Sequence, residues 1–161
     1  MINLATVQLR TTATDKVGAT RTRTTPTFIV DTTAPTAIAF TGNTNRTNQD
    51  VTATGTSTDV LAGLWTTGML YKTTYAFGAD CAGGTTTVPV FTSDGYQTGY
   101  ACIYDRAGNI RTGQQGYKID KTAPIISSMT STKSANAIFF ENTTVTDVPS
   151  GIASYLWAKI S

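Results

Sequence analysis

The acidic side chains are the residues of this chain best suited to chemistry, because histidine is absent from all 161 residues. Its absence excludes His-based triads, imidazole general bases and His metal ligands together. The ten acidic residues fall mainly at expected turns, whereas a catalytic acid needs apolar surroundings that raise its pKa. No glycine motif that cradles phosphate is present. We therefore expect no enzymatic activity, and cation binding or turn capping remains for the aspartates.

The sequence repeats itself with a period of about 89 residues. Three pairs of aspartates recur at nearly one offset: 90 residues from Asp15 to Asp105, 89 from Asp31 to Asp120 and 88 from Asp59 to Asp147. Three agreeing offsets indicate a tandem array. The period is the size of one small β-sandwich domain.

Two motifs accompany these aspartates. Asp-x-Ala-Gly-Asn occupies 105–109, and (Val/Ile)-Asp-x-Thr-Ala-Pro occurs at 30–35 and 119–124. Together they resemble the bacterial immunoglobulin-like repeats of large surface adhesins and extracellular fibres. The resemblance covers the whole chain. It implies the last strands of a first repeat in 1–34, a complete repeat in 35–124 and the first strands of a third repeat in 125–161.

Composition agrees with an all-β fold of tandem immunoglobulin-like sandwiches, one complete and two partial. Threonine supplies 35 of the 161 residues, and β-branched side chains favour pleated strands. No stretch shows a sustained 3.6-residue period. The residues with the heaviest apolar load are expected to form the centre of the core: Leu64, Trp65, Leu70, Tyr71, Tyr75 and Phe77.

Cys81 and Cys102 are the only cysteines. Their count and the extracellular resemblance favour a disulfide, with two buried free thiols as the alternative. Cys102 alternates with Ala101 and Ile103, which we assign to the inward face. The predicted bridge therefore lies on the outer face or at an edge of the sandwich.

The aspartates are expected to meet at the joint between repeats. In an immunoglobulin-type sandwich, the loop after the second strand and the loop before the last strand lie at the end where the chain enters. Asp59 begins the first loop, Asp105 begins the second, and Asp31 lies in the entering linker. With Asn109 and backbone carbonyls, these carboxylates would offer the six to eight oxygens that calcium takes.

The following joint has matching carboxylates at Asp120 and Asp147. The resemblance implies calcium at such joints, as adhesin repeats often use it to stiffen them. Spacing alone also permits an alternative in which each aspartate caps a tight turn without an ion.

The resulting interpretation is an extracellular structural module of a multi-repeat bacterial surface protein or fibre. The alternatives are a ligand-binding adhesin domain and an accessory module of a secreted hydrolase. A charged content of 14% and a net charge of +2 argue against nucleic acid as a partner. No run is long enough to span a membrane, and the first residues do not form an export signal.

Neither partial repeat can bury its apolar face alone. Neighbouring repeats of the same protein are therefore the expected partners, either within one polypeptide or by head-to-tail strand addition between molecules. Until they are covered, these apolar side chains should face water: Phe28, Val30, Ile138, Phe139, Phe140 and Trp157.

Overall fold

The structure is a computed structural model that describes residues 4–135, 137–148 and 150–154. Within these ranges the backbone forms strands and turns and no helix, which confirms the predicted all-β class. No helix able to cross a membrane occurs in the described part. The chain divides into two compact units. The first comprises the chain up to Thr41 with Ala53–Pro89 and Gly99–Gln115. The second comprises Gly42–Thr52, Val90–Thr98 and the chain from Gly116 onward.

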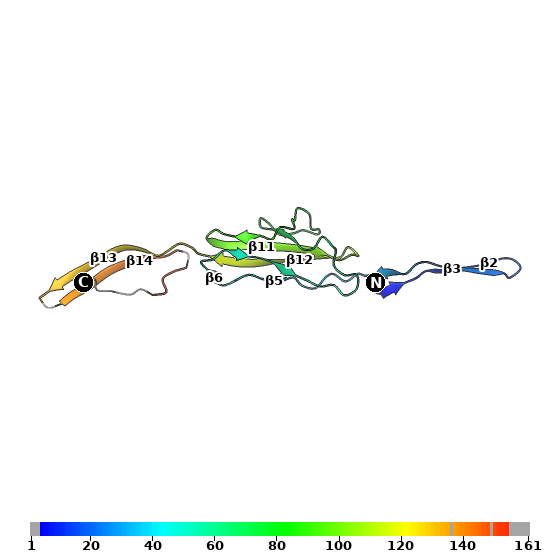
Figure 1. Ribbon diagram of the computed structural model, residues 1–161, viewed down its shortest axis with the longest axis horizontal. Helices are drawn as coiled ribbons and strands as arrows, with labels where there is room; N and C mark the ends of the chain where they lie inside the picture. The colour runs from blue at the N-terminus through cyan, green and yellow to red at the C-terminus, as the bar shows by residue number, and fades with distance from the viewer. Residues whose placement is uncertain (1–3, 136, 149, 155–161) are drawn as a thin grey trace. The chain divides into compact units, whose positions relative to one another are not determined.

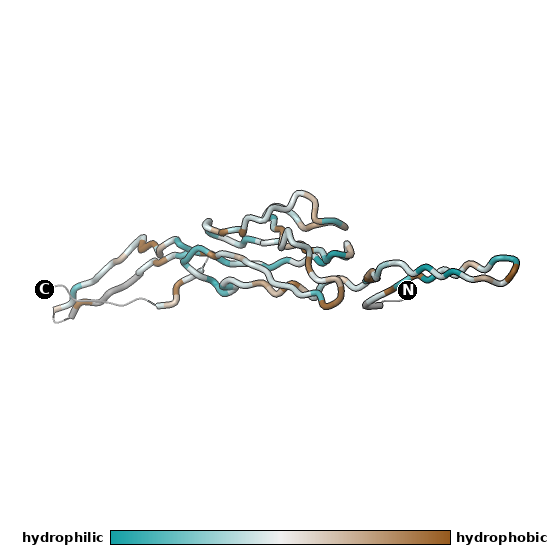
Figure 2. The backbone as a smooth tube through the Cα atoms, turned by 45° about the vertical axis from the view of Figure 1, so that its right-hand side comes forward, coloured by the Kyte–Doolittle hydropathy of each residue, from teal (hydrophilic) through white to brown (hydrophobic). Residues whose placement is uncertain are grey.

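The first unit begins with one hairpin rather than two uninterrupted strands. Strand β1 (Leu4–Val7) pairs with β4 (Phe28–Val30), and β2 (Arg10–Thr14) pairs with β3 (Thr20–Thr24), both antiparallel (Figure 1). Every side chain of β2 and β3 is exposed, and Figure 2 shows how hydrophilic this hairpin is. The β-propensity of threonine therefore favours these strands although neither has a buried face.

The rest of the first unit contains the main packing. Strand β5 (Ala39–Phe40) pairs with β8 (Gly55–Thr56), and β9 (Leu70–Lys72) pairs with β11 (Gly95–Tyr104). Ala101, Cys102 and Ile103 are successive residues of β11, and none is more than 3% exposed. Because successive side chains point to opposite faces of a strand, β11 must be covered on both faces here.

The second unit has apolar packing of its own. Strand β6 (Arg46–Thr47) runs parallel to the end of β12 (Ile110–Ile119), and β7 (Val51–Thr52) pairs with β10 (Val90–Phe91). The Phe91 and Tyr117 rings stack with centroids 5.2 Å apart. Beyond this cluster, β13 (Ile125–Ser134) and β14 (Ala137–Thr146) form a separate antiparallel pair. The sheet order is β6-β12-β11-β9, and strands β11 and β12 have residues in both units.

The prediction that Trp65 and Tyr75 lie in the core is wrong, because they are 46% and 61% exposed. The disulfide joins Cys81 and Cys102 on the face of β11 opposite Ala101 and Ile103, the outer face that the alternation predicted. It is nevertheless buried there, because the two residues are only 6% and 0% exposed. The chain around Phe77 and Cys81 folds onto the Cys102 side of β11 and forms a second apolar cluster there.

The partial repeats agree with part of the expectation. Phe28 and Ile138 are 41% and 61% exposed, whereas Val30 is half-buried. The last residues of the predicted third repeat, Trp157 among them, lie outside the described residues, as do the side chains of Phe139 and Phe140.

Candidate metal centre

The turn that begins at Asp105 has the same geometry as the turn that begins at Asp15, its counterpart in the first copy. In Asp105–Asn109 the Asp105 amide donates to the Asn109 carbonyl at 3.0 Å, and Gly108 has a φ of +92°. In the first copy the Asp15 amide donates to the Ala19 carbonyl at 2.9 Å, and Gly18 has a φ of +89°. Glycine adopts this left-handed conformation without steric cost. The sequence repeat is therefore also a repeat of local structure.

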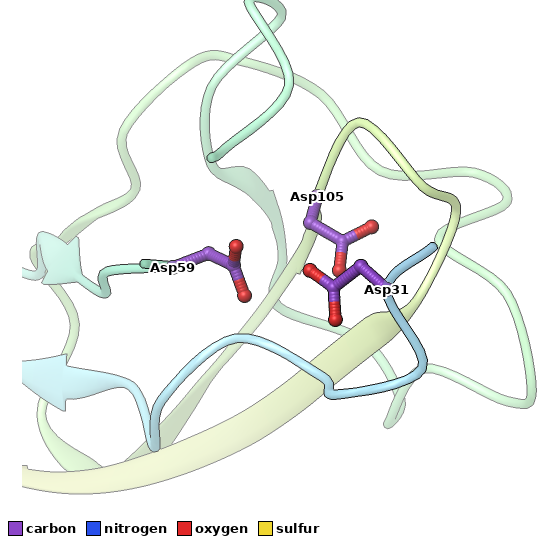
Figure 3. A group of neighbouring side chains, drawn as sticks. All are labelled: Asp31, Asp59 and Asp105. Carbon is purple, nitrogen blue, oxygen red and sulfur yellow. The ribbon is translucent and has the colours of Figure 1, made fainter. Parts of the chain in front are cut away.

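Three aspartates from distant parts of the first unit converge as the sequence predicted. Asp31 directly follows β4, Asp105 directly follows β11, and Asp59 lies three residues beyond the end of β8. One carboxylate oxygen of each lies within 4.8 Å of the others. Figure 3 shows the three carboxylates turned toward one another. Asp31 and Asp105 are buried, at 7% and 0% exposure, and Asp59 is half-buried.

Backbone amides hold these carboxylates in place. Asp59 Oδ1 accepts hydrogen bonds from the amides of Leu61, Ala62 and Gly63 at 3.1, 3.0 and 2.9 Å. Asp31 Oδ2 accepts from the same Ala62 amide at 3.0 Å. The linker residue Asp31 is thereby tied to the loop that follows β8.

Asp105 and Asn109 complete the network. Asp105 Oδ1 accepts from the amides of Ala107 and Asn109 at 2.8 and 2.9 Å. Asn109 Nδ2 donates to Asp105 Oδ2 at 2.7 Å and to the Asp31 carbonyl at 3.1 Å. Asn109 was predicted to supply a ligand oxygen, but its amide nitrogen faces both aspartates. Through this nitrogen Asn109 links Asp105 to the backbone of Asp31.

The cluster consists of three carboxylates held on capped turns. Two unit charges 4.8 Å apart repel by about 3 kcal/mol at an effective dielectric constant of about 20. Among the described residues no lysine or arginine forms an ion pair with any of the three. Asp59 Oδ2 accepts no hydrogen bond from the described residues, so it retains its full capacity as a ligand. An oxygen-only donor set of this kind fits calcium better than a transition metal.

Asp120 and Asp147, the aspartates predicted for the second joint, each have one carboxylate oxygen with a hydrogen bond and one without. Asp120 Oδ1 accepts from the Thr122 amide at 3.2 Å, just as Asp31 Oδ1 accepts from Thr33 at 2.8 Å. Asp120 Oδ2 is buried and has no hydrogen-bond partner among the described residues. The same is true of Asp147 Oδ1, while Asp147 Oδ2 accepts from the Ser150 hydroxyl at 3.0 Å. Among the described residues, neither aspartate belongs to a group of three carboxylates close enough to share a cation.

Asp94 anchors the linker after β12 and was missed by the sequence reasoning. Its Oδ1 accepts from the Lys121 amide at 2.7 Å, and its Oδ2 accepts from the Thr122 hydroxyl. The hydrogen bond from the Thr122 hydroxyl contributes most, and together the two bonds lower the pKa of the Asp94 carboxyl below its ordinary value of 3.8. Lys121 Nζ also pairs with Asp50. An Asp-Gly pair before a strand signals a turn, but nothing in it signals a partner 27 residues away.

Comparison with protein-family models, with curated proteins and with solved structures finds no match to this chain.

Proposed function

We propose that the chain is an extracellular structural module of a multi-repeat bacterial surface protein or fibre. It acts as a spacer in which immunoglobulin-like sandwiches follow one another through stiff joints, and it has no catalytic role. The observation that carries the proposal is the hydrogen-bond network at Asp31, which fixes a linker residue to two loops of the next repeat. A joint held in this way transmits orientation from one repeat to the next.

The joint at Asp31, Asp59 and Asp105 binds calcium in this proposal. The three converging carboxylates support it, because a divalent cation would offset their mutual repulsion. Asp120 and Asp147 form the corresponding site of the next joint. Their buried and unpartnered oxygens are consistent with a joint that closes only when a further loop is present.

The partners of the two partial repeats are neighbouring repeats of the same protein. Tyr117 and Ile119 are fully buried in the complete repeat, whereas their counterparts Phe28 and Val30 are exposed and half-buried. Covering a side chain of this size stabilises by about 1.5–3 kcal/mol. The proposed cover is a neighbouring repeat, supplied either in the same polypeptide or by strand addition from a second molecule in a head-to-tail assembly.

Sedimentation of the whole chain over a range of concentrations tests the assembly. Strand addition between molecules should give a series of oligomers that grows with concentration, because the contact does not close on itself. Phe28→Asp should shift this series toward monomer, and Thr12→Asp, on an exposed strand position of the same hairpin, should not. A monomer at all concentrations, with 28–30 and 125–134 protected from hydrogen exchange, would refute assembly between molecules.

A ligand-binding adhesin domain is the second candidate, and one observation favours it. The exposed rings of Trp65 and Tyr75 provide the surface aromatic groups that a recognition site needs.

A further inference from the structure

The first unit contains a recess outside the aspartate joint. It has a volume of about 320 Å³, within the range of small-ligand sites. Its lining combines two tyrosine rings, one lysine and several threonine hydroxyls, including Tyr71, Lys72, Tyr75, Gly83, Thr85 and Thr87. No role at the joint or in the packing of repeats accounts for this combination.

The walls of the recess are fixed by hydrogen bonds and by the disulfide. The Tyr71 hydroxyl accepts a hydrogen bond from the Gly55 amide at 3.0 Å, and its ring is buried. Tyr71 and Thr85 exchange two main-chain hydrogen bonds, of 2.7 and 3.1 Å. The disulfide anchors Cys81, whose carbonyl accepts from the Gly84 amide at 3.2 Å. The recess is therefore preformed, and a ligand that binds there would lose little affinity to the ordering of side chains and loops.

Lys72 presents a cation without an anion. Its Nζ lies 4.2 Å from the ring centroids of both Tyr75 and Phe77, so two cation–π contacts hold the ammonium group of this half-buried residue. No acceptor among the described residues hydrogen-bonds this Nζ, which carries three donors. An ideal Cβ on Gly83 would lie 3.8 Å from the Nζ and 3.7 Å from the Tyr75 hydroxyl. The glycine thus leaves the space beside both groups open.

Tyr75 supplies an apolar platform next to this cation. The residue is 61% exposed, and Lys72 lies over its ring. An exposed ring packs well against the apolar C–H face of a pyranose, and threonine hydroxyls at the rim can exchange hydrogen bonds with sugar hydroxyls. A cation beside the platform favours a sugar that carries a negative charge.

We propose that this recess binds a saccharide bearing a carboxylate, such as a hexuronate. The carboxylate accepts hydrogen bonds from Lys72 Nζ, the ring of the sugar packs on Tyr75, and its hydroxyls meet the threonine rim. This activity goes beyond the spacer role and does not depend on calcium or on assembly.

Amide NMR titration of the whole chain with sodium glucuronate, with glucose and with acetate tests the proposal. Glucuronate should give saturable shifts centred on the amides of Lys72, Gly83 and Thr85. Its affinity should exceed those of glucose and of acetate by about 10- to 150-fold, as a hydrogen bond to a charged group is worth about 1.5–3 kcal/mol.

Matched variants identify the groups responsible. Lys72→Gln should reduce the affinity for glucuronate to that for glucose, and Tyr75→Ala should weaken both sugars. Lys118→Gln and Tyr96→Ala, at an exposed lysine and a 69% exposed tyrosine elsewhere, should leave the affinities unchanged. Absence of saturable shifts at the recess would overturn the proposal. So would equal binding of glucose, equal binding of acetate, or tighter binding of an acidic dipeptide.

Discussion

Breaking the disulfide should destabilise the first unit by an amount that its position in the structure defines. Cys81 and Cys102 are 21 residues apart, and closing a loop of that length stabilises by about 3 kcal/mol in the chain-entropy model. Both cysteines belong to the apolar cluster with Leu70 and Phe77, so reduction also leaves two thiols in a packed site. We expect a loss of about 3 kcal/mol in the free energy of unfolding of this unit, with the fold retained.

Two measurements check this prediction. Urea unfolding of the oxidised and the reduced chain, followed by tyrosine and tryptophan fluorescence, gives the difference in free energy. Reduction in native buffer should be slow and should accelerate in mild denaturant, because Cys102 is 0% exposed and Cys81 is 6% exposed. Equal unfolding midpoints, fast native reduction, or free thiols in a non-reducing peptide map would each refute the reasoning.

Three further predictions concern single side chains. In urea unfolding, Gly84→Ala should lower the free energy of unfolding by about 1–3 kcal/mol, because the added Cβ would lie 2.8 Å from the Cβ of buried Leu70. The control Gly78→Ala should be near neutral, because its added Cβ would have nothing within 4 Å. Asp105→Ala should cost about 3 kcal/mol in the same assay, because it removes a buried carboxylate and leaves three donors unpaired. Carboxyl NMR titration should find the pKa of Asp94 below 3.8 and raised toward that value in Thr122→Val. Because the folded-state pKa is lowered, the Asp94 contacts stabilise above the unfolded pKa and are lost as pH falls through the folded one.

The sequence predicted the joint better than it predicted the core. The repeated offsets marked Asp31, Asp59 and Asp105, and the sandwich connectivity was enough to expect their carboxylates in one place. Alternation along β11 indicates that Cys102 points away from the Ala101 side, but it does not say what covers that side. The segment around Phe77 that covers this side has no regular alternation of apolar and polar residues. Neither the burial of the disulfide nor the exposure of Tyr75 could therefore be predicted from the sequence pattern.

The orientation of Asn109 is a similar case. Its residue type permits either an oxygen ligand or a pair of donors. Only the positions of Asp105 Oδ2 and the Asp31 carbonyl show where its amide nitrogen donates.

Calcium binding at the joint is tested by calorimetry and thermal unfolding of the whole chain and of Asp59→Asn. The substitution keeps the Oδ1 that accepts three backbone amides, so the turn should survive while one ligand charge is lost. Asp80→Asn is the matched control, at an exposed turn where Oδ1 accepts only the Ala82 amide at 3.1 Å. A calcium concentration one hundred times the Kd stabilises a single site by about 2.7 kcal/mol.

The most direct measurement is the melting temperature of the first unit in calcium and in chelator. The proposed joint predicts a higher melting temperature in calcium for the whole chain and for Asp80→Asn, and a much smaller increase for Asp59→Asn. Identical melting in calcium and in chelator, with no calorimetric heat at millimolar calcium, would contradict the calcium joint and leave these aspartates as turn caps.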